Sequence, residues 1–199
     1  MPRWTQSTLA LLATFAVAGA TFAAEGVAVG SKAPDFTLKD QSGHEVALSS
    51  SDGSIRVLEW VNPDCPFVQR HYAAGTMKKL AEHYAGDGVV WLAINSTSTM
   101  AAAGSVVFRD SHDLPYPVLI DRDGTVGHLY GAATTPHMFV IDGNGTVVYE
   151  GAIDDDPRGT EEAPTNYVAA ALDSLLAGKP VAIPETKPYG CSVKYPKGS

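Results

Sequence analysis

Alternating hydrophobic and polar positions mark the first patterned part of this sequence. Residues 33–48, APDFTLKDQSGHEVAL, alternate on both sides of Ser42-Gly43, which predicts a β-hairpin. The run that follows at 55–61, IRVLEWV, is mostly apolar and contains several β-branched residues. Such a run is typical of a central strand that is buried on both faces of a sheet.

Helical and extended patterns then alternate along the rest of the chain. Apolar residues at helical spacing after Cys65 predict one helix that ends at Gly86, through Val68, Tyr72, Leu80 and Tyr84. The remaining segments are a strand at 88–95, a weakly patterned helix at 100–112, a strand at 116–121 with a turn at Asp123-Gly124, hairpin strands at 137–142 and 146–153, an amphipathic helix at 166–178 and a proline-rich, irregular tail at 179–199.

This order of elements predicts a fold of the α/β class. Strands that alternate with helices favour parallel pairing, and the final hairpin adds antiparallel strands. We therefore expect a mixed central sheet with helices on both faces and an N-terminal β-hairpin. The expected organisation is a signal peptide at 1–23, one domain at 24–178 and a C-terminal tail at 179–199 that carries Cys191.

The first 23 residues have the composition of a secretory signal peptide. Arg3 supplies the positive charge, residues 9–17 the apolar stretch and Ala18-Gly19-Ala20 a cleavage site, although cleavage after Ala23 also fits. An uncleaved membrane anchor is the alternative, but the segment is short and no basic cluster follows it. We expect an exported protein, periplasmic or extracellular, with no stable membrane span after cleavage, in a compartment where disulfides persist.

Charge and cysteine content narrow the function classes. The formal net charge of the 199-residue chain is −8, and removal of Arg3 with the signal peptide takes it from −8 to −9. An acidic chain without a Lys/Arg cluster argues against nucleic acid and anionic membrane surfaces as partners. Its 2 cysteines are too few for a disulfide-rich scaffold or a zinc ribbon, so they act singly or as a pair.

Cys65 lies in the segment NPDCPFV, between a predicted strand and a predicted helix. Pro66 suits the first turn of a helix, because its missing N–H would have no intrahelical partner there. The sulfur would then lie at a helix N-terminus, where the dipole and the free amides favour the thiolate, which is the nucleophilic form. The adjacent Asp64 disfavours that anion, and a buried, inert cysteine is the alternative.

Three segments resemble the redoxin branch of the thioredoxin-like superfamily, the alkyl hydroperoxide reductase/thiol-specific antioxidant family. They are GSKAPDFTLKDQSGHEVALSS at 30–50, VLEWVNPDCPFV at 57–68 and ATTPHMFVID at 133–142, within a resemblance that spans roughly residues 27–178. The resemblance implies a thioredoxin-like fold, whose order of elements agrees with the one predicted above. It also implies that Cys65 is the redox cysteine.

The resemblance implies roles for three further residues. Thr135-Pro136 would be the cis-proline loop, which packs against the redox sulfur and offers the threonine backbone to an extended substrate chain. A trans turn proline is the alternative. Glu59, 6 residues before Cys65, matches the buried carboxylate that shuttles protons in thioredoxins. A strand-end glutamate that points to solvent is the other interpretation.

The chain departs from the family pattern around Cys65. Thioredoxins use C-x-x-C, but Val68 stands where the second cysteine would be, and Asn62 occupies the equivalent place before Cys65. Peroxiredoxins place Thr or Ser three residues before the peroxidatic cysteine and Pro seven before it, where this chain has Asn62 and Leu58. The hydroxyl that would orient a peroxide is therefore absent, which argues against a fast peroxidase.

Cys191, 126 positions after Cys65, is the remaining candidate for a partner thiol. The entropy cost of closing a loop grows only logarithmically with its length, so this separation forbids nothing. An intramolecular Cys65–Cys191 disulfide is predicted for the exported protein. Tyr189-Gly190 and Ser192 suggest a flexible, polar setting for a mobile arm. A purely structural staple and a pair of unpaired thiols are the alternatives.

Metal binding is a competing chemistry. His71 and His137 could join Cys65 around copper or zinc, as in the copper-chaperone branch of the superfamily. That branch uses C-x-x-x-C with a distant histidine, and the second cysteine is missing here, so we expect His71 to be an exposed helix residue. The run Asp154-Asp155-Asp156 lacks the ligand spacing of a calcium loop and is expected to be a solvated loop.

The sequence therefore predicts an exported thiol–disulfide oxidoreductase or slow thiol peroxidase of the antioxidant class, with Cys65 as nucleophile and Cys191 as resolving partner. Glu59, Thr135 and Pro136 complete the expected catalytic site, with no metal and no cofactor. The expected partners are a small thiol, a peroxide or a protein disulfide, together with an electron donor that the sequence does not name. The alternative is a non-catalytic redoxin-like binding module in which a Cys65–Cys191 disulfide pins the tail.

Overall fold

The computed structural model describes residue 1 and residues 26–198. The predicted signal peptide, apart from Met1, therefore lies outside the described residues. Within the described part of the chain, none of the helices has the length and apolar character needed to cross a lipid bilayer.

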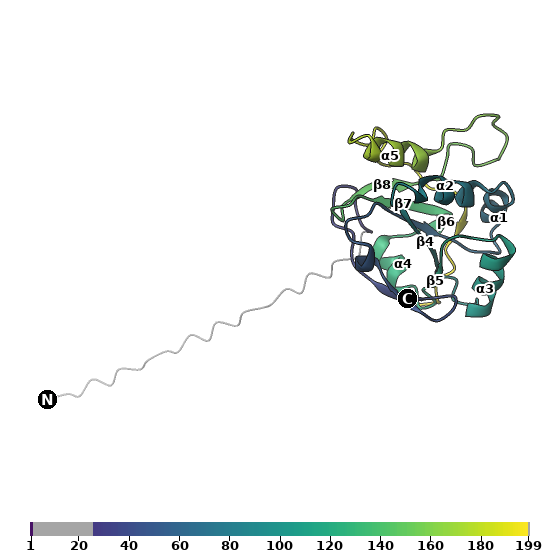
Figure 1. Cartoon of the computed structure of the whole chain (residues 1–199). Coiled ribbons are helices and arrows are strands. Elements are labelled where there is room, and N and C mark those ends of the chain that lie inside the picture. The colour runs from purple at the N-terminus through teal and green to yellow at the C-terminus, as the bar shows by residue number, and fades with distance from the viewer. Residues whose placement is uncertain (2–25, 199) are drawn as a thin grey trace.

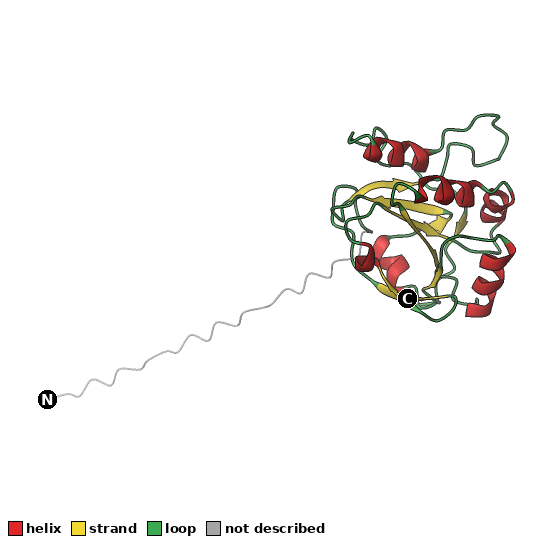
Figure 2. Ribbon diagram, in the orientation of Figure 1, coloured by secondary structure: helices red, strands yellow, loops and turns green. Residues whose placement is uncertain are grey.

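A seven-stranded mixed sheet forms the centre of the fold (Figures 1 and 2). Its strands are β1 (Thr37–Asp40), β2 (Glu45–Ala47), β3 (Arg56–Trp60), β4 (Val90–Asn95), β5 (Val118–Ile120), β7 (His137–Ile141) and β8 (Val147–Gly151). Their spatial order is β2-β1-β5-β4-β3-β7-β8. The pairs β3–β4 and β4–β5 are parallel, and the other pairs of neighbouring strands in this sheet are antiparallel. The predicted mixed sheet and the predicted N-terminal hairpin, β1–β2, are therefore confirmed.

Helices cover both faces of this sheet, as the sequence predicted. They are the 3-10 helix η1 (Leu48–Ser51) and the α-helices α1 (Pro66–Ala73), α2 (Thr76–Ala85), α3 (Ala102–Ser111), α4 (Thr125–Tyr130) and α5 (Tyr167–Leu176). Side chains of α1, α2, α3 and α5 pack into one apolar cluster, and side chains of η1 and α4 into another. Alternate residues of β3 enter the two clusters, Val57 the first and Leu58 the second, because successive strand side chains point to opposite faces.

Two helical predictions need correction. The single helix expected between Cys65 and Gly86 is two helices, which are separated at Gly75, whose φ of 69° is left-handed and caps the start of α2. A left-handed residue cannot continue a right-handed helix, and glycine adopts this conformation without steric cost. The turn expected at Asp123-Gly124 leads into α4, a short helix that the sequence pattern did not predict.

The C-terminal tail is docked on the domain. Its Thr186 N–H donates to the carbonyl of Glu150, a residue of β8, at 3.1 Å. Further along, β9 (Cys191–Ser192) pairs with β6 (Thr134–Thr135) in a second, two-stranded sheet. Figure 1 shows the tail, in yellow, passing close to β6 before the chain ends. The mobile arm expected from the sequence is therefore a bound segment.

Candidate active site

Cys65 is the N-terminal capping residue of α1, as predicted. Asn62 shapes the preceding turn, because its Oδ1 accepts from the N–H of Asp64 and its carbonyl accepts from the N–H of Cys65, both at 3.0 Å. Pro66 occupies the first helical position, where no N–H is needed. Cys65 is 1% exposed, so its sulfur lies at a helix N-terminus that is shielded from bulk solvent.

The sulfur of Cys65 contacts the Thr135-Pro136 loop. The peptide bond between Thr135 and Pro136 is cis, and the Cys65 Sγ–H donates to the carbonyl oxygen of Thr135 at 3.0 Å. The predictions that this bond is cis and that it lies beside Cys65 are both confirmed.

β9 brings Cys191 to the same loop. In its antiparallel pairing with β6, Cys191 lies opposite Thr135, and the Thr135 hydroxyl donates to the Cys191 carbonyl at 3.5 Å. Gly190 permits this close approach. Its φ is 137°, and a Cβ at this position would overlap the carbonyl oxygen of Thr135. A residue with a side chain therefore cannot replace Gly190 without moving the tail away from β6.

The two thiols are adjacent and differ in acidity. Both cysteines are free, and a hydrogen bond joins their side chains. Burial raises the pKa of Cys65, but hydrogen bonds to its sulfur from the Cys191 thiol, the Val68 N–H and the Thr135 side chain outweigh burial, so that the pKa of Cys65 is lowered. Burial, the same hydrogen bond and the charge of Cys65 raise the pKa of Cys191 to about 11. Cys65 is thus the more acidic thiol of the pair and Cys191 the less acidic one.

A cavity of about 620 Å³ opens beside both cysteines. Besides Cys65 and Cys191, it is lined by the loop residues 97–99 that follow β4 and by tail residues between 193 and 197. Three charged side chains line it as well, those of Asp64, Lys194 and Lys197. A small molecule in this cavity would lie beside Cys65, which is otherwise buried.

Glu59, on β3, is fully buried. Its carboxylate accepts from the Tyr72 hydroxyl at 2.9 Å and from Nε1 of Trp91 at 3.0 Å, and the hydroxyls of Tyr72 and Tyr116 are 3.3 Å apart. Burial raises the pKa of Glu59 to about 7, although the bonds from Trp91 and Tyr72 lower it. Of the two interpretations of Glu59, the buried carboxylate is therefore correct and the solvent-facing glutamate is wrong. A carboxyl group with this pKa changes its protonation near neutral pH.

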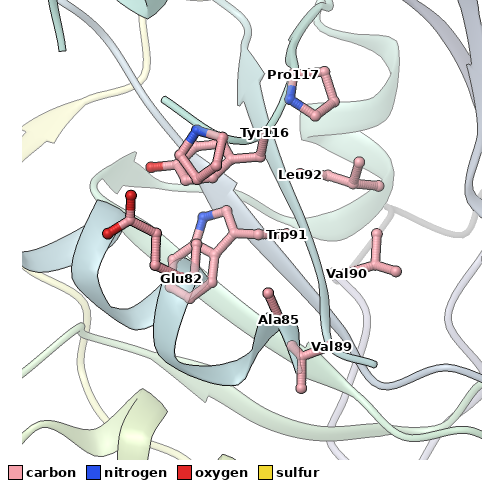
Figure 3. A pocket seen from close by; sticks show the side chains of 10 residues that line it. Glu82, Ala85, Val89, Val90, Trp91, Leu92, Tyr116 and Pro117 are labelled. Atoms are coloured by element: carbon pink, nitrogen blue, oxygen red, sulfur yellow. The ribbon is translucent and has the colours of Figure 1, made fainter. Parts of the chain in front are cut away.

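A second cavity, a surface groove of about 410 Å³, lies between α2, the start of β4 and residues 115–117 (Figure 3). Figure 3 shows the rings of Trp91 and Tyr116 side by side in its lining, near Glu82 of α2. Their ring centroids are 5.8 Å apart. Because Trp91 binds Glu59 and Tyr116 contacts Tyr72, these two rings connect the groove to the Glu59 network, whereas neither cysteine lines it.

A partly buried polar cluster, formed by Arg70, His71, Asp154 and Tyr189, holds the tail two residues before Cys191. The Tyr189 hydroxyl donates to Asp154 and lies 2.9 Å from Nε2 of His71 and 3.2 Å from a terminal nitrogen of Arg70. Nδ1 of His71 is 3.9 Å from Oδ2 of Asp154. Burial lowers the pKa of His71, and Asp154 opposes this effect.

This cluster corrects two expectations. His71 is buried and not an exposed helix residue, and in the Asp154-Asp155-Asp156 run both Asp154 and Asp156 are buried. The carboxylate of Asp156 accepts backbone N–H groups of the loop that follows, from Gly159, Thr160 and Glu161. The partner of His71 and Asp154 is Tyr189, which local sequence does not place beside them. The N–H groups around Asp156 belong to its own loop, which folds back over the carboxylate.

Tyr195 anchors the tail on the other side of Cys191. Its ring stacks on His128 with centroids 3.9 Å apart, and its hydroxyl donates to the carbonyl of Ala132 at 2.7 Å. Gly127 of α4 leaves room for this ring, since a Cβ there would overlap the Tyr195 hydroxyl. Neither tyrosine was recognised from sequence as an anchor. The one available signal was that both flank Cys191 in PYGCSVKY.

Among the residues that the structure describes, no group of three or more His, Cys, Asp or Glu side chains is placed to bind a metal ion. The two histidines considered as ligands have other surroundings. His71 lies in the Tyr189 cluster, and Nδ1 of His137 accepts from the N–H of Ala133 at 3.2 Å. Burial lowers the pKa of His137 to about 4.

A family model described as the AhpC/TSA family matches residues 29–150. The chain belongs to this family. Over 151 residues it is 33% identical to the thiol-disulfide oxidoreductase ResA of Geobacillus thermodenitrificans (strain NG80-2), covering 73% of this chain and 84% of that protein. Over 123 residues it is 32% identical to the thioredoxin-like protein YneN of Bacillus subtilis (strain 168), covering 61% and 70% of the two chains.

The fold is also similar to a solved structure that spans most of the chain. A hypothetical protein from Sinorhizobium meliloti 1021 superimposes with a TM-score of 0.80 at 30% sequence identity, covering 87% of this chain and 98% of that chain. The predicted thioredoxin-like fold of the redoxin branch is therefore confirmed. The family and its relatives also support thiol–disulfide oxidoreduction as the class of chemistry.

Proposed function

We propose that this protein is an exported thiol–disulfide oxidoreductase in which Cys65 is the nucleophile and Cys191 resolves the mixed disulfide. One observation carries the proposal. Cys191 lies opposite Thr135 in the pairing of β9 with β6, and Cys65 donates to the carbonyl of that same Thr135. Two cysteines 126 positions apart are thus in contact through one loop. The export part of the proposal rests on the N-terminal sequence.

The reduced protein reacts in two steps. The Cys65 thiolate attacks one sulfur of a disulfide RSSR, which forms a mixed disulfide on Cys65 and releases one thiolate that takes up a proton. Cys191 then loses its proton, attacks the Cys65 sulfur and releases the second RSH, leaving a Cys65–Cys191 disulfide. The protein gives up two electrons and RSSR gains them as two RSH, and the reverse sequence oxidises a dithiol.

The surrounding residues have distinct roles in this scheme. Thr135 and cis Pro136 hold the backbone carbonyl against the Cys65 sulfur. Glu59 serves as a proton store, because a carboxyl with a pKa of about 7 can take up or release a proton while Cys191 changes its own. Its hydrogen bonds go to Tyr72 and Trp91, so its part in this scheme is to hold a proton and not to bind the substrate.

Membership of the AhpC/TSA family favours a peroxide as a second oxidant. The Cys65 thiolate would attack ROOH to give a sulfenic acid and ROH, and Cys191 would condense with the sulfenic acid to give the disulfide and water. Asn62 stands where peroxiredoxins carry a hydroxyl, and its side chain is bound to the N–H of Asp64. We therefore expect this reaction to be slow.

Thiol trapping tests the proposed roles. The reduced chain without residues 1–23 is mixed with a small disulfide, quenched with acid, alkylated and analysed by mass spectrometry. We expect the wild type to end as an intramolecular Cys65–Cys191 disulfide, Cys191→Ser to stop at a mixed disulfide on Cys65, and Cys65→Ser not to react. Ser174→Ala, which removes an exposed hydroxyl of α5 that bonds within its own helix, is the control and should behave as wild type. A mixed disulfide that forms first on Cys191 contradicts the assignment.

The reduction potential separates the proposed function from the structural alternative. Structural disulfides lie below about −300 mV, whereas catalytic ones have higher potentials. A Cys65–Cys191 bond well below that limit would identify a binding module with a stapled tail. Export is tested separately, by measuring whether the protein isolated from its source has lost residues 1–23.

A further inference from the structure

The C-terminal tail occupies the strand edge next to the reactive cysteine. β9 pairs with β6, and the N–H of Val193 extends this pairing by donating to the carbonyl of Ala133 at 3.1 Å. Extended peptides commonly bind a protein by adding a strand to an exposed sheet edge. In this protein its own tail provides the added strand. A polypeptide that pairs with β6 from this side must therefore displace β9 first.

The tail is fastened on both sides of this strand. Tyr189 is held by its hydrogen bonds to His71 and Asp154, and Tyr195 is held by its stacking on His128 of α4 and its bond to Ala132. Between β9 and Tyr195, the Lys194 carbonyl accepts from the N–H of Ser98 at 2.9 Å. Displacement of β9 would break several of these partly buried hydrogen bonds together, which makes the tail a barrier to large substrates.

The cavity of about 620 Å³ remains open beside Cys65, a volume typical of a small-molecule site. Its charged residues are two lysines, Lys194 and Lys197, and one acid, Asp64, in a chain whose net charge is −8. The Lys194 ammonium donates to the Ser192 hydroxyl at 3.1 Å, which holds it near β9. A local excess of positive charge favours the approach of anions.

We infer that the tail makes Cys65 selective for small, anionic disulfides and prevents its reaction with polypeptide disulfides. The inference rests on the proposed function, because it requires Cys65 to react by thiol–disulfide exchange. The chemistry is the two-step reaction given above, with RSSR bearing carboxylates. The Cys65–Cys191 pair supplies both electrons, and two molecules of the carboxylate-bearing thiol leave.

The charge preference is tested with two small disulfides of similar size, anionic 3,3′-dithiodipropionate and cationic cystamine. Each second-order rate constant for the reduced protein is divided by the rate of the same disulfide with a neutral thiol, which removes the intrinsic reactivity of the probe. We expect the anion to be preferred about tenfold at low salt, and the preference to disappear in the double variant Lys194→Gln/Lys197→Gln.

The matched control is Lys179→Gln/Lys187→Gln, which removes two tail lysines that do not line the cavity and should keep the preference. Equal normalised rates for the two probes in the wild type would overturn the anionic part of the inference. So would a preference that survives the loss of Lys194 and Lys197.

Access is tested in a Cys191→Ser background, where a mixed disulfide on Cys65 accumulates and resolution plays no part. The probes are insulin, for polypeptide disulfides, and 3,3′-dithiodipropionate. Gly190→Ala should push β9 away from Thr135, because the added Cβ overlaps that carbonyl. We expect this change to accelerate the reaction with insulin about tenfold relative to the small probe. An unchanged ratio would overturn the inference.

Gly178→Ala is the control for backbone strain. Gly178 also has a positive φ, of 67°, but a Cβ there would meet no atom within 4 Å beyond its chain neighbours. Gly178→Ala should therefore leave the rates with insulin and with 3,3′-dithiodipropionate unchanged. Retained reaction of Gly190→Ala with the small probe shows that the variant is folded. If Cys65 forms no mixed disulfide with any probe, the proposed function itself fails. If the small probes react, but insulin reacts equally fast with the protein in which β9 is paired with β6, the proposed function stands and this inference fails.

Discussion

Cys191 lies directly opposite Thr135 in the antiparallel pairing of β9 with β6. Thr135 precedes the cis proline, and its carbonyl accepts a hydrogen bond from Cys65, so one residue contacts both cysteines. The position of the second thiol is therefore set by backbone pairing. In this way the chain brings two thiols together without the C-x-x-C motif.

The first prediction concerns the order in which the thiols ionise. In the reduced wild type we expect the ultraviolet absorbance of thiolate to rise first with a pKa below the ordinary 9.0, from Cys65, and again near 11, from Cys191. Cys191→Ala should raise the pKa of Cys65, because it removes the hydrogen bond that stabilises the thiolate. Cys191→Ser is the control, since its hydroxyl keeps a donor at that position. A first ionisation that persists in Cys65→Ser would contradict the assignment.

The second prediction is that Glu59 makes the reduced protein less stable as the pH rises. Burial raises the pKa of Glu59 from an ordinary 4.5 to about 7, so between these values the folded protein keeps a proton that the unfolded chain has lost. The free energy of unfolding therefore falls as pH rises through this window, by about 3 kcal/mol in total. Glu59→Gln cannot ionise and should remove this part of the pH dependence.

Urea unfolding of both proteins at about pH 5 and about pH 8 measures this effect. Glu82→Gln, which changes a glutamate that is exposed on α2, is the matched control and should keep the wild-type pH dependence. If Glu59→Gln and the wild type lose the same stability between the two pH values, the buried carboxyl does not titrate as stated.

The third prediction is that Tyr189→Phe loosens the tail. The change removes the hydroxyl that binds Asp154 and His71 and leaves a buried carboxylate short of a donor, so we expect a loss of about 1–3 kcal/mol in unfolding free energy. Formation of the Cys65–Cys191 disulfide should also slow severalfold, because Cys191 is held less well. Tyr84→Phe is the control, since it removes a tyrosine–aspartate bond, to Asp173 of α5, in which neither β9 nor Tyr189 takes part. Equal disulfide-formation rates in Tyr189→Phe and the wild type would rule out a positioning role.

The fourth prediction is that oxidation stabilises the protein. A Cys65–Cys191 disulfide closes a loop of 126 residues and restricts the unfolded chain, which should add about 2–5 kcal/mol to the free energy of unfolding. Urea unfolding of the oxidised and reduced proteins gives the difference. Cys191→Ser, treated with the oxidant used for the wild type, should show no gain in the free energy of unfolding. A wild type whose free energy of unfolding does not change on oxidation would contradict the prediction.

Local sequence determined the scaffold and the position of Cys65. Strand β3 follows from an apolar run flanked by polar residues, and the hairpin of β1 and β2 from alternation around a Ser-Gly turn. The cap of α1 follows from Cys-Pro, because proline lacks the N–H that a first helical residue does not use. These features depend on backbone preferences over a few residues, so they could be predicted before any tertiary contact was known.

Only the tertiary structure decided which surroundings the polar residues have. His71 and Asp154 look like surface residues in the sequence, but Tyr189, more than a hundred positions after His71, covers both. Glu59 allowed two interpretations until Trp91 and Tyr72 were seen to bind it. The tail has no regular pattern of its own, because its single short strand is formed by pairing with β6. The position of Cys191, and with it the candidate site, follows from contacts between distant segments, which no periodicity within the tail can encode.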